Sequence, residues 1–300
     1  MSVIECKGLT KVYHHKKAIN NLSVKIEENK ITGLIGRNGA GKTTLLKIIA
    51  GHLKATSGEM KVFSENPFNS LIVSANHIFI HDQMSLPTAL CLEEILETSG
   101  RFYDNWDRDL AQRLFGYFSL HPLQRYTDLS KGMMSTFKMI LGLSARCPLT
   151  IFDEPTSGMD AAVRKDFYRA LLKDYIANPR SFIISSHHLE EMEDLLEDIL
   201  LMKDGSTLLH MPTADFREWA IGFQGKAVVV NEWTKNREVL YSKKIGIDSR
   251  YVALKNDFSK AELGAAHAAG VEIHPVATSD LCVYLTGKTK GGIDDVFVES

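Results

Sequence analysis

The segment 36–44, GRNGAGKTT, constrains this chain more than any other part of its sequence. It fits the pattern G-x-x-x-x-G-K-[ST], with an apolar run at 31–36 leading into it and a helical pattern at 42–50 after it. Glycines let consecutive backbone N–H groups surround a phosphate, and the following helix directs its positive end at the same place. A glycine-rich turn without a ligand is the simpler interpretation, but this strand–loop–helix context favours a phosphate-binding loop.

The loop supplies most of the candidate ligands for a nucleotide. Lys42 is expected to reach the β- and γ-phosphates, and the hydroxyl of Thr43 is expected to complete a Mg²⁺ site. The candidate nucleotide-binding residues of the loop are Gly36, Asn38, Gly39, Gly41, Lys42, Thr43 and Thr44.

A second acidic pair follows another buried strand. Residues 149–154 read LTIFDE, so Asp153 and Glu154 come at the carboxyl end of an apolar run. Open parallel sheets bind ligands at that edge. Asp153 is placed to hold Mg²⁺, and Glu154 to polarise the water that attacks the γ-phosphate. Alone, an acidic turn would be the better interpretation; after a phosphate loop it is not.

The order of apolar runs and helical patterns predicts an α/β fold. Short apolar runs at 31–36, 149–152 and 182–185 are typical of buried parallel strands. A helix-rich stretch at about 86–146 predicts an insert between two strands of the sheet. Beyond Pro212 a small α+β domain is expected. Helical patterns occupy 42–50, 107–118, 131–146, 160–176 and 188–197, and the tail has β-like runs at 227–230, 239–245, 251–254 and 271–273 with one helix at 260–269.

Composition disfavours a nucleic-acid-binding protein, a disulfide-rich protein and a membrane-spanning protein. The 300 residues carry a formal net charge of −2, which gives no reason to expect nucleic acid as the main partner. The four cysteines lie far apart without a CxxC pair, as expected of reduced thiols. We see no signal segment, and no apolar run approaches the roughly 20 residues that a membrane span needs. If the protein serves a membrane, another chain is expected to supply the membrane part.

Further motifs follow the phosphate loop in a fixed order. Residues 129–133 read LSKGM, the Asp153–Glu154 pair is continued by PTSGMD at 155–160, and 184–187 read ISSH. With Tyr13 near the start, these motifs resemble those of the ATP-binding cassette (ABC) family over residues 3–210. The resemblance implies the P-loop NTPase fold of ABC ATPases, with a mostly parallel core sheet, an antiparallel β subdomain and a helical subdomain. It places the nucleotide-binding domain at 1–211, the helical subdomain at about 86–146, and a C-terminal α+β accessory domain at 212–300.

The resemblance also implies roles for individual residues. Glu154 and His187 are the expected catalytic residues, and Tyr13 is expected to stack on adenine. Ser130 and Gly132 are expected to contact the γ-phosphate of ATP bound to a partner cassette. Asp160 is expected to bridge the two cassettes; Ser130 and Asp160 also suit helix N-caps.

Two departures from the family pattern matter. Lys131 and Met133 stand in the signature where Gly and Gln are usual, which puts the contacts of Met133 in doubt. The glutamine loop reads IHDQM at 80–84, so either Asp82 or Gln83 fills its position. We favour Gln83 as the metal ligand on chemistry, because a neutral amide can face both metal and water, but the register stays open.

The expected function is ATP binding and hydrolysis, with Mg²⁺, in a subunit that powers transport through a separate membrane permease. Pairing with a second cassette, identical or paralogous, and a cytoplasmic location at the inner face of the membrane follow from the resemblance. The stretch 279–287 resembles the C-terminal segment of the export-type subfamily for antibiotics and peptides. The alternatives are an ABC ATPase acting on ribosomes or DNA, and a regulatory module that binds ATP without turnover. The charge balance disfavours the first, and the presence of Glu154 and His187 disfavours the second.

Overall fold

The computed structural model describes residues 1–287, and the chain forms two compact units that divide between His210 and Met211. The last part of the predicted accessory domain, 288–300, lies outside the described residues. Within the described part, no helix combines the length and the apolar character needed to cross a bilayer. The four cysteines are free thiols, and burial raises the pKa of Cys6 to about 11 and that of Cys147 to about 12.

A six-stranded sheet in the order β5-β6-β7-β3-β8-β9 organises the first unit. Its neighbours from β5 through β8 pair in parallel, which confirms the predicted α/β fold with a mostly parallel sheet. The strands β3 and β6 are buried throughout, as expected where both faces of a sheet are covered. The bounds are β3 Ile31–Ile35, β5 His77–Ile80, β6 Leu149–Asp153, β7 Ser181–Ser186, β8 Asp198–Lys203 and β9 Ser206–Pro212.

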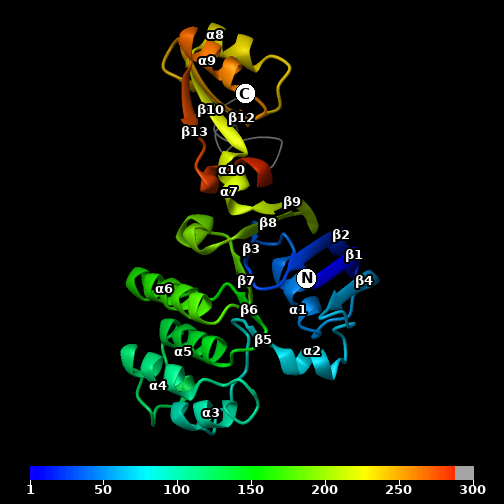
Figure 1. The fold of residues 1–300 in the computed structure, drawn as a ribbon, viewed down its shortest axis with the longest axis vertical. Coiled ribbons are helices and arrows are strands. Elements are labelled where there is room, and N and C mark those ends of the chain that lie inside the picture. The colour runs from blue at the N-terminus through cyan, green and yellow to red at the C-terminus, as the bar shows by residue number, and fades with distance from the viewer. Residues whose placement is uncertain (288–300) are drawn as a thin grey trace, which may run out of the picture. The chain divides into compact units, whose positions relative to one another are not determined.

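Each face of this sheet is covered by a different layer. The helix α1 and an antiparallel sheet of order β2-β1-β4 lie on one side, and α5 and α6 lie on the other (Figure 1). One apolar core joins α1, the antiparallel sheet and Leu34, Ile151 and Ile183 of the parallel sheet. The bounds are β1 Ser2–Tyr13, β2 Lys16–Glu27, α1 Lys42–Ile49, β4 Ser57–Val62, α2 Leu71–Asn76 and α6 Ala161–Ala177.

The helical insert lies between the neighbouring strands β5 and β6, as predicted. Its helices begin at residues that suit helix starts: Asp107 accepts from the N–H of Leu110 before α4, and Ser130 from that of Met133 before α5. The bounds are α3 Leu92–Ser99, α4 Arg108–Tyr117, a 3₁₀ turn at Tyr126–Asp128, and α5 Lys131–Ser144.

The second unit is a four-stranded antiparallel sheet of order β11-β12-β10-β13 with α8 and α9 packed on it. In chain order its elements run β-α-β-β-α-β, which is the ferredoxin-like arrangement. Phe223, Val252 and Leu254 of the sheet share a core with Val230 of α8 and Ala266 of α9. The bounds are α7 Thr213–Glu218, β10 Ala220–Lys226, α8 Ala227–Thr234, β11 Val239–Ile245, β12 Ser249–Lys255, α9 Lys260–Ala268, β13 Glu272–Pro275 and α10 Thr278–Thr286.

Two predicted elements are wrong. The expected strand at 227–230 is the first turn of α8, because Val230 and Thr234 are buried and Val229 and Trp233 pack against the same core at helical spacing. The expected helix at 188–197 consists of two 3₁₀ turns, Leu189–Glu191 and Glu193–Leu195. Leu189, Met192 and Leu195 are buried at intervals of three residues, which is the period of a 3₁₀ helix.

A partly buried ionic network anchors the insert to the sheet. Asp174 of α6 lies 2.6 Å from Arg180, just before β7, and 3.2 Å from Arg146, just after α5. Arg146 in turn lies 2.7 Å from Asp107, the residue that caps α4. Burial lowers the pKa of Arg180, and the Asp174 charge acts in the opposite direction.

We predict that Asp174→Asn destabilises the first unit by about 3–5 kcal/mol, because the buried guanidinium of Arg180 and the partly buried one of Arg146 lose their shared counter-charge. Urea unfolding followed by tryptophan fluorescence measures the loss. Lys173→Met, at the neighbouring exposed position of α6, is the control and should change stability by less than about 0.5 kcal/mol. Equal stability of the two variants would contradict an anchoring role for the network.

Candidate active site

The register of three parallel strands brings distant loops to one edge. Asp153 at the end of β6 lies opposite Ser185 of β7, and Ser186 of β7 lies opposite Ile35 of β3. The chain that leaves β3 is the glycine-rich loop, while the chains that leave β6 and β7 carry Glu154 and His187. Because all three strands end at the same edge, these segments meet there.

The glycine-rich loop has the backbone that phosphate binding requires. Gly39 and Gly41 have φ values of +85° and +103°, in the region that favours glycine. A Cβ atom at Gly41 would lie 2.4 Å from the carbonyl oxygen of Ala18. Lys42 is 6% exposed, and its ammonium donates to the carbonyl oxygen of Gly36 at 2.6 Å. The loop is therefore closely packed against Ala18 at Gly41, whereas no atom lies within 4 Å of a Cβ placed at Gly39.

A cavity of about 340 Å³ lies in front of the loop. The loop residues from Arg37 to Thr44 line it, and Tyr13 and Glu154 line it too. Tyr13 is 42% exposed, and the ammonium of Lys11 lies 5.2 Å from the centre of its ring. The structure thus brings together every predicted nucleotide-binding residue of the loop except Gly36, whose carbonyl lies beneath Lys42.

Ser185 orients both members of the acidic pair. Its hydroxyl donates to Oδ1 of Asp153 at 2.5 Å and accepts from the N–H of Glu154 at 3.0 Å. Glu154 has φ of +50°, which is unusual for a residue with a side chain and recurs at functional sites. The backbone at this point therefore turns the Glu154 carboxylate away from the line of β6 and toward the loop.

The carboxylate of Glu154 lies between Lys42 and His187. Its Oε1 is 3.3 Å from Nζ of Lys42, and its Oε2 is 2.9 Å from Nδ1 of His187. Oε1 is buried and accepts no hydrogen bond within the described residues, so the Lys42 ammonium is an electrostatic contact that leaves a lone pair of Oε1 available. The ring of His188 lies against that of His187, with centres 3.9 Å apart and planes tilted by 46°, and it is His187 that contacts the carboxylate.

The loop after β5 contributes Asp82. A small pocket is lined by Asp82 together with Asp153, Glu154, Ser135 and Lys138, and Gln83 is not among its lining residues. Gln83 is exposed. The arrangement therefore favours Asp82 over Gln83 at this position, against the preference drawn from the sequence.

The remaining predicted residues lie outside this cavity. Ser130 is the N-cap of α5, and Asp160 is the N-cap of α6, where its Oδ1 accepts from two backbone N–H groups at 2.9 Å. A Cβ atom at Gly132 would lie 2.7 Å from the carbonyl oxygen of Gly158, so α5 packs closely on the loop before α6. Neither helix start lines the cavity in front of the glycine-rich loop.

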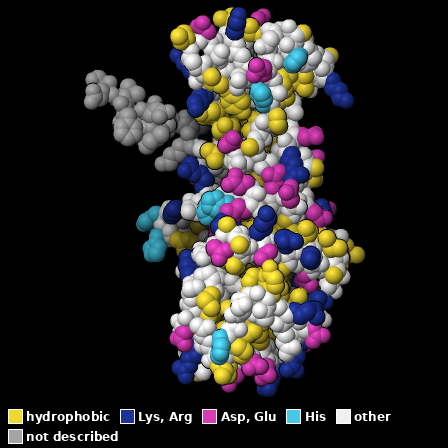
Figure 2. Space-filling view, turned by 90° about the vertical axis from the view of Figure 1, so that its left-hand side faces the viewer, with side chains coloured by type: hydrophobic (Ala, Val, Ile, Leu, Met, Phe, Trp, Pro, Cys, Tyr) yellow, Lys and Arg dark blue, Asp and Glu magenta, His cyan; other side chains and the backbone are white. Residues whose placement is uncertain are grey.

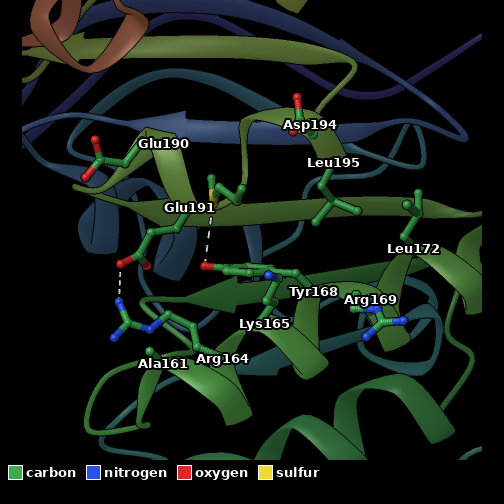
Figure 3. A pocket seen from close by; sticks show the side chains of 11 residues that line it. Ala161, Arg164, Lys165, Tyr168, Arg169, Leu172, Glu190, Glu191, Asp194 and Leu195 are labelled. Atoms are coloured by element: carbon green, nitrogen blue, oxygen red, sulfur yellow. Dashed lines mark hydrogen bonds and ion pairs between the residues drawn. The ribbon is translucent and has the colours of Figure 1, made fainter.

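A larger cavity, of about 430 Å³, lies between α6 and the segment that follows His187 (Figure 3). Arg164 of α6 forms an ion pair across it with Glu191, and the Tyr168 hydroxyl lies 4.0 Å from the sulfur of Met192. Burial raises the pKa of Tyr168 to about 12, so this phenol stays protonated at neutral pH. No residue of the glycine-rich loop lines this cavity, and its contacts attach the segment after His187 to α6.

Sequence reasoning missed Ser185 and Lys138. Ser185 lies in the ISSH motif, but only the pairing of β7 with β6 shows that it contacts the acidic pair. Lys138 is the one charged residue within the apolar run FKMIL of α5, and that charge was the sequence signal that could have found it.

The donors at this edge fit Mg²⁺ bound together with a phosphate. Asp153 and Thr43 offer oxygen ligands, which Mg²⁺ prefers. Among the described residues no group of three or more His, Cys, Asp or Glu side chains could hold a metal alone. Mg²⁺ in ATPases is held by one or two protein groups with substrate phosphates, so this sparse donor set suits it.

The fold and the site define a phosphate-loop ATPase. The sequence profile described as ABC transporter matches residues 19–157, and one described as an AAA domain, putative AbiEii toxin, matches residues 122–193. The chain thus contains an ABC transporter ATP-binding domain, a member of a family of ATPases.

Individual relatives agree with this assignment. The ABC transporter ATP-binding protein YtrB of Bacillus subtilis (strain 168) is 28% identical over 222 residues, or 74% of this chain and 76% of that protein. The bacitracin transport ATP-binding protein BcrA of Bacillus licheniformis is 27% identical over 264 residues, or 77% and 79% of the two chains. The dimeric ATP-binding cassette MJ0796 bound to ADP and Pi shares the fold, with a TM-score of 0.62, 21% identity, and coverage of 70% of this chain and 98% of that one.

We predict that Gly41→Ala weakens ATP binding at least about tenfold, because the new methyl group meets the Ala18 carbonyl and the backbone leaves its left-handed conformation. Gly39→Ala, where no atom lies within 4 Å of the added Cβ, separates the two effects, since it carries only the backbone strain. Titration calorimetry with ATP measures both affinities. Equal losses of affinity would show that backbone strain alone, and not the contact between the added methyl group and Ala18, weakens ATP binding.

Proposed function

We propose that this chain is the ATP-hydrolysing subunit of an ABC transporter, which acts as one of two paired nucleotide-binding domains and powers transport through separate membrane permease subunits. The observation that carries the proposal is the position of Glu154. Its carboxylate lies between the ammonium of Lys42 and the ring of His187, at the mouth of the phosphate-loop cavity.

The side chains divide the hydrolytic work among them. The loop N–H groups and Lys42 bind the phosphates, and Glu154 accepts a proton from the attacking water through Oε1, which accepts no hydrogen bond within the described residues. His187 holds the other oxygen of Glu154 and so fixes the direction of the base. Mg²⁺, when bound, neutralises phosphate charge and polarises the γ-phosphoryl group. Asp153 and Thr43 would hold it, with Ser185 orienting Asp153.

A second nucleotide-binding domain completes the site. Ser130, Gly132 and Asp160 lie at the starts of two helices away from the chain's own phosphate loop. Helix N-termini favour anions, so the start of α5 suits the γ-phosphate of ATP held by a partner. We infer that the partner is a second copy of this chain or a paralogue, and that Tyr13 stacks on adenine.

The helical insert is the proposed contact for the permease. A cavity of about 470 Å³ lies between α3 and α4, with Trp106, Leu96 and Phe115 among its walls. Phe102 beside it is 78% exposed. Glu93, Glu97, Arg101 and Arg108 also line it, and a groove with both apolar and charged walls suits an amphipathic helix from a membrane subunit. Binding there would place the chain at the inner face of the membrane.

The class of cargo follows from similarity. The name of BcrA, a bacitracin transport protein, supports an antibiotic or peptide as the cargo. On the face drawn in Figure 2, basic and acidic side chains of the described residues are interspersed. A nucleic-acid-binding surface gathers Lys and Arg, and neither this face nor the formal net charge of −2 shows such an excess, which disfavours a role on ribosomes or DNA.

We predict that Glu154→Gln lowers the ATPase rate by about 10²–10⁴-fold, because the amide cannot accept the proton. ATP binding should persist, because Lys42 and Asp153 are unchanged. ATP would then join the phosphate loop of one domain to the signature of the other, and the variant should form a dimer only with ATP. Sizing with and without ATP, beside a steady-state ATPase assay, measures both effects.

The double variant Glu154→Gln/Ser130→Arg is the control for the interface, because the large side chain blocks the start of α5. It should bind ATP and stay monomeric. Undiminished hydrolysis by Glu154→Gln would exclude Glu154 as the base. A monomer in all conditions would contradict self-pairing and indicate a paralogous partner.

We predict that Phe102→Glu reduces co-sedimentation of the chain with membranes that contain the permease, because a carboxylate replaces an exposed aromatic ring beside the α3–α4 groove. Ile176→Glu on α6, 70% exposed and outside the insert, should co-sediment like wild type. The ATPase rate of the purified variants checks the fold. Equal sedimentation of both variants would place the permease contact elsewhere.

A further inference from the structure

Lys138 is a buried charge outside the roles described above. It lies in α5, in the stretch 136–144 where every residue is buried, and its side chain is 5% exposed. A buried ammonium is unfavourable unless acceptors replace the water that it loses. Its contacts therefore decide what this lysine does.

The ammonium of Lys138 holds the end of a neighbouring strand. It donates to the carbonyl oxygen of His81 at 3.0 Å and to that of Asp82 at 2.6 Å. It also lies 5.9 Å from the centre of the Tyr126 ring, within the range of a cation–π contact. Burial lowers the pKa of Lys138, while the charge of Asp82 opposes that shift. The two carbonyl contacts make the buried charge tolerable.

Those two carbonyls belong to the loop beside the acidic pair. The last residue of β5, Ile80, pairs with Phe152 of β6, so residues 81 and 82 continue next to Asp153. Asp82, Lys138, Asp153 and Glu154 line one small pocket. A contact made by Lys138 therefore fixes the loop that borders the proposed metal side of the site.

A second contact attaches the same part of α5 to another loop. Ser135, one turn before Lys138, donates to the carbonyl oxygen of Ser157 at 2.8 Å, in the loop between Glu154 and α6. Ser130 begins α5 eight residues before Lys138, about 12 Å along a helix. Because a helix moves as a rod over two turns, a shift at Lys138 would move the Ser130 end.

We propose that Lys138 is a positioning residue that locks the 81–82 loop to the first two turns of α5, so that the acidic edge and the signature at Ser130 move as one body. The proposal rests on the proposed function, because it gives this rigid coupling a role in hydrolysis. Lys138 does not line the phosphate-loop cavity, so its effect on turnover is separable from nucleotide binding.

The test compares Lys138→Met, which keeps the apolar stem and removes the donors, with Lys138→Arg, which keeps them. For Lys138→Met we expect kcat to fall at least about tenfold with KM for ATP within about threefold, because misplaced groups slow chemistry without weakening phosphate contacts. Amide exchange in 81–84 and 130–136 should accelerate while the other amides keep their protection. Lys138→Arg should recover most of both losses, and Lys173→Met, exposed on α6, should match wild type.

The outcomes separate the proposal from its alternatives. Wild-type kcat and exchange in Lys138→Met would overturn it. So would a general loss of amide protection with kcat and KM both impaired and no recovery by arginine, since that is the result of a purely structural role. If wild type itself hydrolyses no ATP, the proposed function fails, and exchange measured without nucleotide still decides whether Lys138 locks the loop to α5.

Discussion

The parallel register of β6, β7 and β3 is the constraint on which the site depends. Asp153 lies opposite Ser185, and Ser186 lies opposite Ile35, so the segments that follow these strands emerge at one edge. A slip of one residue would reverse which side chains face each layer, and both faces of this sheet are covered. The same burial that stabilises the sheet therefore fixes where Lys42, Glu154 and His187 meet.

Backbone conformation then sets the direction of the reactive groups. Glu154 has φ of +50°. The Ser185 hydroxyl accepts a hydrogen bond from the N–H of Glu154 and donates one to the carboxylate of Asp153. One serine thus stabilises an unfavourable backbone turn and orients a neighbouring carboxylate. Strain at such a position persists only when surrounding contacts determine it. The glycine-rich loop reaches its conformation differently, through residues with no Cβ at the points of closest approach.

The sequence predicted what depends on local spacing. The phosphate loop, the strand before it, the 153–154 pair and His187 are recognisable because each motif and its strand are contiguous. It failed where contacts from elsewhere decide the outcome. Apolar residues at 227–230 suit a strand, and only packing against β10 and β12 makes them helical. The choice between Asp82 and Gln83 likewise depends on how β5 pairs with β6, and Lys138 is informative only through carbonyls more than 50 residues away.

The two helix starts assigned to a partner domain serve their own helices first, and the two uses are compatible. Ser130 accepts one N–H with its hydroxyl oxygen, which leaves the hydroxyl hydrogen to donate to a phosphate. Asp160 caps α6 through Oδ1, which leaves Oδ2 for a contact across an interface. Capping therefore orders both side chains before a partner arrives. Because a surface ordered in this way loses less conformational freedom on association, capping lowers the entropic cost of the proposed pairing.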